Sequence, residues 1–237
     1  MKVCLIAPDS MLHQKMDMDF VLAHRLIQSR KYMNHYARAN TFKILDNGAY
    51  ENDKMDMWDI LRVADEISAA EIILPDTIMR RMPKEFYEEL IPSLPKGYQY
   101  QVIPQGSTPM EWREAYLELC DLDGVDTIGI PIWLSKEFGS RPNVVLHMFR
   151  KGELNLSKNH HLLGLDNYWE LIMYPPGLIR SVDTSLPFSM AASKVNSSMY
   201  MEPEEHKRVK DNADVQDLDL KIFHSEKAML RAITRLV

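Results

Sequence analysis

FKILDNGAYE, the stretch Phe42–Glu51, is the part of the sequence from which the fold can be read. An apolar run that ends in Asp46, Asn47 and Gly48 is typical of a buried strand that delivers polar side chains at its carboxyl end. Glycine there allows the backbone to approach a ligand closely. We therefore expect Asp46 to act on a substrate. The alternative is an Asx-type turn that only closes the strand, for which Asp-Asn-Gly is ordinary chemistry.

Seven further β-rich runs resemble this one, and mostly helical segments separate them. The runs cover residues 3–7, 20–24, 72–76, 98–103, 127–132, 160–165 and 178–183. Helical spacing of apolar residues covers 29–39, 57–67, 86–91, 109–119, 144–149 and 168–173. Eight short strands alternating with helices predict an α/β fold, a single compact (β/α)8 TIM-like barrel, with a doubly wound sheet as the alternative.

The whole chain, residues 1–237, is expected to form one domain. The barrel would occupy about residues 1–190, and extra C-terminal helices about residues 200–237. A polar helix is predicted to begin at Pro203, and an amphipathic helix carries Met229, Ile233 and Leu236.

Polar residues and glycines gather at the carboxyl ends of the eight predicted strands. They are Asp9, His24, Asp46, Asp76, Gln105, Gly129, Gly164 and Asp183. In a barrel these ends converge on one mouth, which is where barrel enzymes keep their chemistry. The pattern therefore predicts an enzyme.

Composition excludes several classes of protein. Cys4 and Cys120 are the only cysteines among 237 residues, so neither a disulfide framework nor a Cys-rich zinc site is expected. No run of eighteen apolar residues and no basic-then-apolar leader occurs, so we expect a cytoplasmic protein with no membrane partner. The formal net charge of −6 argues weakly against nucleic acid as a partner, but the position of basic residues matters more. Four separated basic clusters, each of which can also be plain solvated surface, lie at 30–31, 80–81, 150–151 and 207–210.

Three carboxylates end strands: Asp46, Asp76 and Asp183. A carboxylate pair in one pocket can divide labour, with one acting as nucleophile and the other trading protons, as in retaining glycoside hydrolysis. The bland alternative for each is a cap or turn residue, and Asp183 precedes Thr184-Ser185, which is helix-cap material. His160 and His161 are adjacent in a strand and face opposite sides, so we expect no metal there.

Aromatic and amide side chains near the strand ends suit a planar ligand. Tyr50 and Trp133 lie just past strand ends, where a ring can stack on a base or can simply pack under a loop. Gln105-Gly106 offers an amide and an open backbone suited to the polar edge of a heterocycle, or only a turn before the next helix.

This arrangement resembles the tRNA-guanine transglycosylase family, and more closely its phage and bacterial branch that modifies DNA with 7-deazaguanines. The family's Asp-Ser-Gly-Gly-Phe/Tyr-Gln stretch is matched by DNGAYE at residues 46–51. Its strand-ending aspartate that reads the guanine edge is matched by Asp76, and its Gln-Gly pair by Gln105-Gly106.

The second half of the chain carries three more matches. Gly129 resembles the glycine whose backbone meets the base, and LLGL at residues 162–165 resembles the family's Leu-Met-Gly-Val strand. The nucleophilic aspartate of the last strand falls on Asp183, where the flanking residues differ most. The similarity runs from about Val3 to Pro187, and its strength lies in the order of the motifs rather than in any one of them.

The resemblance implies base exchange without a cofactor or metal. Asp183 would attack C1′ of a deoxyguanosine and expel guanine, and Asp46 would manage the proton on the departing and arriving bases. Substrate contacts would come from the strand ends: His24, Asn47, Gly48, Tyr50, Asp76, Gln105, Gly106 and Gly129. The free base, guanine or a 7-deazaguanine, would be the second substrate.

Two departures from the family bear on the nucleic acid. The chain has no Cys-rich zinc subdomain, and it is shorter than the tRNA enzymes and lacks their appended RNA-binding parts. Both favour DNA over tRNA as the partner, in a host cytoplasm if the gene is a phage gene. A hydrolytic DNA glycosylase, a reduced tRNA-guanine transglycosylase and an inactive barrel that only binds a partner remain the alternatives, and a homodimer stays open.

Overall fold

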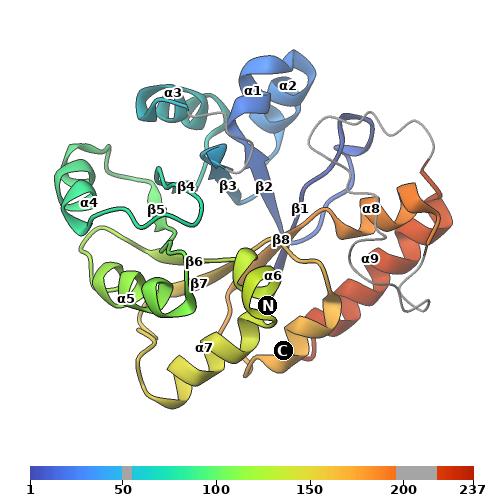
Figure 1. Cartoon of the computed structure of the whole chain (residues 1–237). Helices are drawn as coiled ribbons and strands as arrows, with labels where there is room; N and C mark the ends of the chain where they lie inside the picture. Colours follow the sequence, from blue (N-terminus) through green and yellow to red (C-terminus); the bar gives the residue numbers. More distant parts are fainter. Residues whose placement is uncertain (50–54, 196–217) are drawn as a thin grey trace.

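The computed structural model describes residues 1–49, 55–195 and 218–237, apart from the side chains of 136–138. Its centre is a closed barrel of eight parallel strands in chain order, in which β1 pairs with both β2 and β8 (Figure 1). The strands are β1 Lys2–Leu5, β2 Met18–Leu22, β3 Lys43–Asp46, β4 Glu71–Ile73, β5 Gln99–Val102, β6 Thr127–Pro131, β7 Asn159–Leu163 and β8 Ser181–Thr184. The predicted α/β barrel is thus confirmed.

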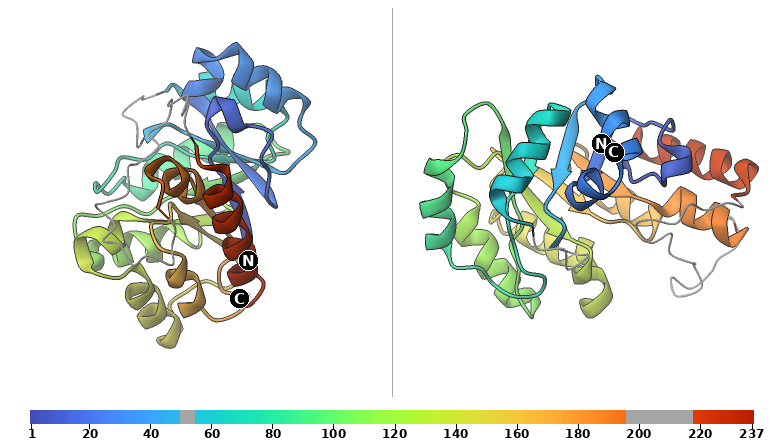
Figure 2. Two further views of the ribbon diagram at one scale, coloured as in Figure 1. Left: turned by 90° about the vertical axis from the view of Figure 1, so that its right-hand side faces the viewer. Right: turned by 90° about the horizontal axis from the view of Figure 1, so that it is seen from above.

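Helices surround the barrel, as three directions of view show (Figures 1 and 2). The α-helices are α1 Ala23–Gln28, α2 Arg30–Arg38, α3 Met57–Ile67, α4 Lys84–Leu90, α5 Pro109–Leu119, α6 Trp133–Phe138, α7 Arg141–Arg150, α8 Leu186–Ser193 and α9 Leu220–Thr234. Short 3-10 helices are η1 Asp9–Met11, η3 Ile91–Ser93 and η4 Tyr168–Met173. Several α-helices begin at residues that the sequence marks as caps; Thr108, for example, accepts from the Glu111 amide before Pro109.

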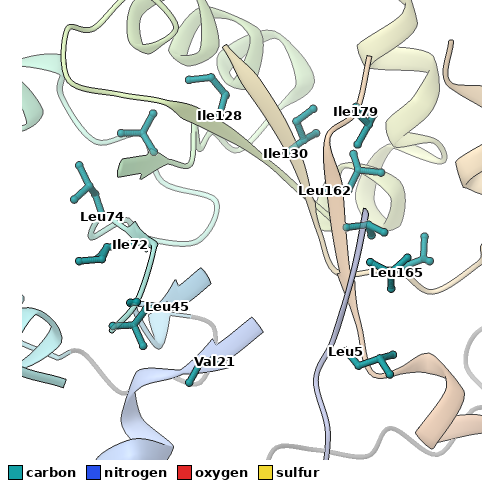
Figure 3. Close-up of a cluster of buried hydrophobic side chains, with 14 of the residues drawn as sticks. Leu5, Val21, Leu45, Ile72, Leu74, Ile128, Ile130, Leu162, Leu165 and Ile179 are labelled. Atoms are coloured by element: carbon teal, nitrogen blue, oxygen red, sulfur yellow. The ribbon is translucent and has the colours of Figure 1, made fainter. Parts of the chain in front are cut away.

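Alternation along the strands sorts apolar side chains into two layers. One set faces the helices and forms the main core, which includes Leu5, Val21, Leu45, Ile72, Ile128, Ile130 and Leu162 (Figure 3). The alternate residues form a separate cluster: Cys4, Met18, Phe20, Leu22, Ile44, Ile73 and Ile103. Because successive strand residues point to opposite faces, this second cluster fills the inside of the barrel.

The C-terminal helix α9 completes the outer shell. The β1–β2 and β7–β8 connections carry only the 3-10 helices η1 and η4. Helix α9 packs on η4 and α8, where Phe188 and Phe223 stack with ring centroids 4.7 Å apart. Lys227 of α9 also donates to Gln14, which follows η1, at 3.0 Å. The two chain ends lie together, as all views show, with the Met1 amine 3.3 Å from the Thr234 carbonyl oxygen (Figures 1 and 2).

Some elements differ in their ends or type from what the sequence predicts. His24 lies in the first turn of α1, because β2 ends at Leu22. Residues 178–180 precede β8 rather than belong to it, and the predicted helix over 168–173 is a 3-10 helix. The predicted helix from Pro203 lies outside the described residues. Within the described part of the chain, no helix combines the length and apolar character needed to span a membrane.

Candidate active site

The stretch after β3 forms two consecutive Asx turns. The Asp46 carboxylate Oδ2 accepts from the Gly48 amide at 3.0 Å, and Asn47 Oδ1 accepts from the Ala49 amide at 2.9 Å. Gly48 has a φ of 76°, a left-handed conformation that glycine adopts without strain. Both side chains are buried at the carboxyl end of β3. The turn interpretation of Asp-Asn-Gly is therefore correct, and it fixes Asp46 and Asn47 at the barrel mouth.

Asp76 is held between two amides from neighbouring strand ends. Its Oδ1 accepts from Asn47 Nδ2 at 2.8 Å, and its Oδ2 accepts from Gln105 Nε2 at 2.7 Å. Asn47 Nδ2 also donates to the Leu74 carbonyl oxygen at 2.7 Å, so both of its amide hydrogens are engaged. Asn47 thus orients Asp76, and each Asp76 oxygen keeps lone-pair capacity for a further donor.

Gln105 is fixed by two donors that sequence reasoning did not connect to it. Its Oε1 accepts from the Met79 amide at 3.0 Å and from Trp133 Nε1 at 2.7 Å. Both groups can only donate, so the orientation of the Gln105 amide follows from the network. Met79 reaches this position with a φ of 57°, which is rare for a residue with a side chain. Trp133 is buried, and its indole N–H supports Gln105, as the packing alternative for this ring expects.

Burial sets the electrostatics of this group. Removal from water raises the pKa of the Asp76 carboxyl above its ordinary value, and the hydrogen bonds from Asn47 and Gln105 oppose the rise. A carboxylate held by two neutral donors, with a raised pKa, is a group suited to bind hydrogen-bond donors of a ligand.

Asp183 is a second buried carboxylate, inside the barrel on β8. Its Oδ1 accepts from His161 Nε2 at 3.1 Å and from the Gly164 amide at 2.9 Å. It is a strand residue and not a helix cap, because Ser185 is the N-cap of α8 and Thr184 Oγ1 accepts from the Leu186 amide. The described residues place no hydrogen-bond donor on Asp183 Oδ2.

Arg141, which sequence reasoning missed, anchors the loop that carries Gly164. The fully buried guanidinium donates at 2.8–3.0 Å to the carbonyl oxygens of Ile130, Leu163 and Gly164. Its Nε donates to Glu170 at 2.6 Å. Burial is the largest single influence and lowers the pKa of Arg141, but Glu170, Tyr174 and Asp183 together outweigh it, so the pKa is raised and the charge is kept. The Arg-Pro pair at the start of α7 gives no sequence signal for this role.

The remaining predicted residues have structural settings. A side chain on Gly106 would lie 2.6 Å from the Trp112 backbone nitrogen, so this glycine lets the loop approach α5. A side chain on Gly129 would meet Gln101, Ile103 and Leu163, all within 2.9 Å. His24 is buried in α1, and Tyr50 lies outside the described residues.

The two adjacent histidines face opposite sides of β7, as expected. His160 Nε2 lies 2.8 Å from the Tyr116 hydroxyl on α5, whereas His161 contacts Asp183 and Ser181 inside the barrel. Among the described residues, no group of histidine, cysteine and carboxylate side chains could hold a metal ion.

Fold and site together define a TIM-like barrel whose strand ends present two separately built carboxylate centres, one around Asp76 and one around Asp183. Asp46, the last residue of β3, directly precedes Asn47, which donates to Asp76 in the first of these centres. Comparison of the chain with protein-family models and with curated proteins gave no match. The proposal for this site therefore rests on its chemistry.

Proposed function

We propose that the chain is a DNA-guanine transglycosylase that exchanges guanine in DNA for a 7-deazaguanine base. The observation that supports this best is the environment of Asp183. Two donors converge on Oδ1, and no described residue donates to Oδ2. A carboxylate oriented through one oxygen can use the other as a nucleophile, which is the requirement of covalent glycosyl transfer.

The proposed reaction has two displacements at C1′. Asp183 Oδ2 forms a bond to C1′ of the target deoxyguanosine while the C1′–N9 bond breaks and its electron pair leaves with guanine. Asp46 donates a proton to the departing base. The incoming 7-deazaguanine then gives its N9 proton to Asp46, its N9 attacks C1′, and the ester bond to Asp183 breaks. Two inversions retain the configuration, and Asp46 returns to its starting protonation state.

Selectivity for guanine follows from the donor and acceptor pattern around Asp76. The two Asp76 oxygens can each accept one more hydrogen bond, which suits the N1–H and N2–H donors of a guanine edge. Gln105 Oε1 is saturated by Met79 and Trp133, so its remaining N–H can only donate, and the guanine O6 is a matching acceptor. Adenine presents a different pattern and would leave buried groups unpaired.

The DNA would meet the barrel at its mouth, with the target nucleotide out of the stack. Arg80 lies in the β4–α4 connection on this side and is a candidate for phosphate contact. Arg81 is engaged by Glu114 and Glu118 of α5. Arg150 and Lys151 end α7, which leads to the opposite end of the barrel, so they are surface residues in this scheme.

The test is incubation of the protein with duplex DNA, with tRNA and with radiolabelled guanine. We expect label to enter DNA, and a protein–DNA adduct to appear on denaturing gels. Asp183→Asn should abolish the adduct, and Asp46→Asn should block exchange while DNA binding persists. Asp123→Asn is the matched control, because Asp123 is exposed in the α5–β6 connection, away from the mouth.

Each alternative has its own outcome. Free guanine with an abasic site, and no need for an added base, would replace exchange by hydrolysis. Label in tRNA alone would make the nucleic acid tRNA. Binding of DNA with no turnover, unchanged by either aspartate variant, would leave an inactive binding subunit.

A further inference from the structure

A chain of polar side chains runs through the barrel to Asp183. Arg180 Nε donates to Ser181 Oγ at 3.1 Å, Ser181 Oγ lies 2.8 Å from His161 Nδ1, and His161 Nε2 lies 3.1 Å from Asp183 Oδ1. His161 and Ser181 are fully buried, so water does not compete for these bonds. At the other end of this hydrogen-bond chain, Arg180 makes a bidentate ion pair with Glu71, at 2.6 and 3.0 Å.

The order of donors in this chain sets the tautomer of His161. Asp183 Oδ1 is a carboxylate oxygen and can only accept, so its contact with His161 Nε2 places the ring hydrogen on that nitrogen. Ser181 Oγ accepts from Arg180 with one lone pair and can turn its own hydrogen toward Nδ1. Nδ1 is then an acceptor, and the ring hydrogen lies on Nε2, facing Asp183. Phe20 stacks on the same ring at a centroid distance of 5.7 Å and an angle of 6°, which holds the imidazole plane. The geometry therefore leaves Nε2–H as the donor to Oδ1.

We propose that His161 is the positioning residue of the nucleophile: Ser181 and Arg180 lock it as the Nε2–H tautomer, and it orients Asp183 so that Oδ2 faces the sugar. The role in the reaction rests on the proposed function, whereas the tautomer does not. Sequence reasoning considered His161 only as a metal ligand, because its partners come from another strand.

The tautomer can be measured in the free protein. Two-bond ¹H–¹⁵N correlation spectra distinguish Nε2–H from Nδ1–H imidazole, and the spectrum of His161→Gln identifies the His161 signals among eight histidines. We expect the Nε2–H pattern in the wild type and its loss or mixing in Ser181→Ala. An Nδ1–H tautomer, or an imidazolium with protons on both nitrogens, would overturn the proposal, whatever the activity of the protein.

The kinetic arm uses the rate of adduct formation in a single turnover and the dissociation constant of DNA. Losing the donor in His161→Phe, which keeps a ring against Phe20, should slow adduct formation by about 10- to 100-fold with DNA affinity unchanged. His161→Gln, which keeps an N–H donor near the Nε2 position, should recover part of the rate. Ser93→Ala, at an exposed serine after α4, is the control and should change nothing.

A double-variant comparison separates positioning from general stability. If Ser181 acts through the tautomer of His161, Ser181→Ala should slow the wild type but not the His161→Gln variant, since glutamine has no ring tautomer to lock. Equal slowing in both backgrounds, or a His161→Gln variant as slow as His161→Phe, would refute the positioning role. The expected spectrum with no adduct in any variant would instead refute the proposed function and leave the hydrogen-bond chain intact.

Discussion

Replacing Arg141 should destabilise the fold strongly, although nothing in the sequence marks this residue as important. Its guanidinium is 0% exposed and ties together the carboxyl ends of two neighbouring strands. Replacement by methionine keeps a long apolar stem but removes the charge and all four donor contacts. Glu170 would then be a nearly buried carboxylate, 10% exposed, and within the described part of the chain the Tyr174 hydroxyl would be its remaining side-chain donor.

The magnitude follows from the ion pair. Removing one partner of a buried pair destabilises a protein by about 3–5 kcal/mol, because the other charge stays buried and uncompensated. For a chain of this length, each kcal/mol lowers the melting temperature by about 2–4 °C, so Arg141→Met should lower it by roughly 6–20 °C. Urea unfolding followed by circular dichroism would give the free energy, and thermal melts would give the temperature.

The chain offers a control and an internal check. Arg62 pairs with Asp59 and Glu66 on the surface of α3 with its side chain 56% exposed, so Arg62→Met should cost about 1 kcal/mol or less. Adding Glu170→Gln to Arg141→Met removes the stranded charge and should recover about 1–3 kcal/mol of the loss. A loss below about 1 kcal/mol for Arg141→Met, or no recovery in the double variant, would refute the reasoning.

Three further predictions follow from other contacts. Burial lowers the pKa of His160 to about 4, so the unfolded chain takes up a proton at a higher pH than the folded protein does. The free energy of unfolding of the wild type should therefore fall by about 3 kcal/mol between pH 6.5 and 4. Urea titrations should show a weaker dependence of this free energy on pH for His160→Gln. In the proposed reaction the ionised form of Asp76 accepts from the base, and burial raises the pKa of Asp76, so the KM for free guanine should rise as the pH falls through that pKa. Asp76→Asn should remove this dependence, with a KM raised at every pH. Phe223→Ala should cost about 3–5 kcal/mol by emptying the α8–α9 contact, measured by urea unfolding, and a loss below about 1 kcal/mol would show that α9 is not part of the core.

The barrel could be predicted because its strands carry two independent signals. Runs such as Lys43–Asp46 are buried along their length, since a parallel strand is covered on both faces, and they end in polar or glycine residues where the chain turns. Boundaries were less certain. Leu178 and Ile179 are as apolar as strand residues but lie before β8, because pairing with β1 begins at Ser181.

The site was predictable only in part, for a physical reason. Asp46, Asp76 and Gln105 can be recognised in the sequence because they are polar residues at or just after the ends of buried strands. Arg141 and the Met79 amide do not, because each acts on groups that barrel closure brings from other strands and loops. Local sequence fixes which residues end a strand, whereas the tertiary register decides which of them share a hydrogen bond.

The chain of polar side chains from Arg180 through Ser181 and His161 to Asp183 would be costly in a barrel with a purely structural role. A buried carboxylate such as Asp183 destabilises a fold unless hydrogen bonds replace its water, and an apolar residue would pack there at less cost. The charge of Arg180 in this chain is balanced by its ion pair with Glu71. Asp183 therefore receives hydrogen bonds from His161 and Gly164 rather than a counter-charge. A direct ion pair would neutralise the oxygen that attacks C1′ in the proposed reaction. Donors on Oδ1 alone orient the carboxylate and leave the charge of Oδ2 available, which is what the proposed displacement requires.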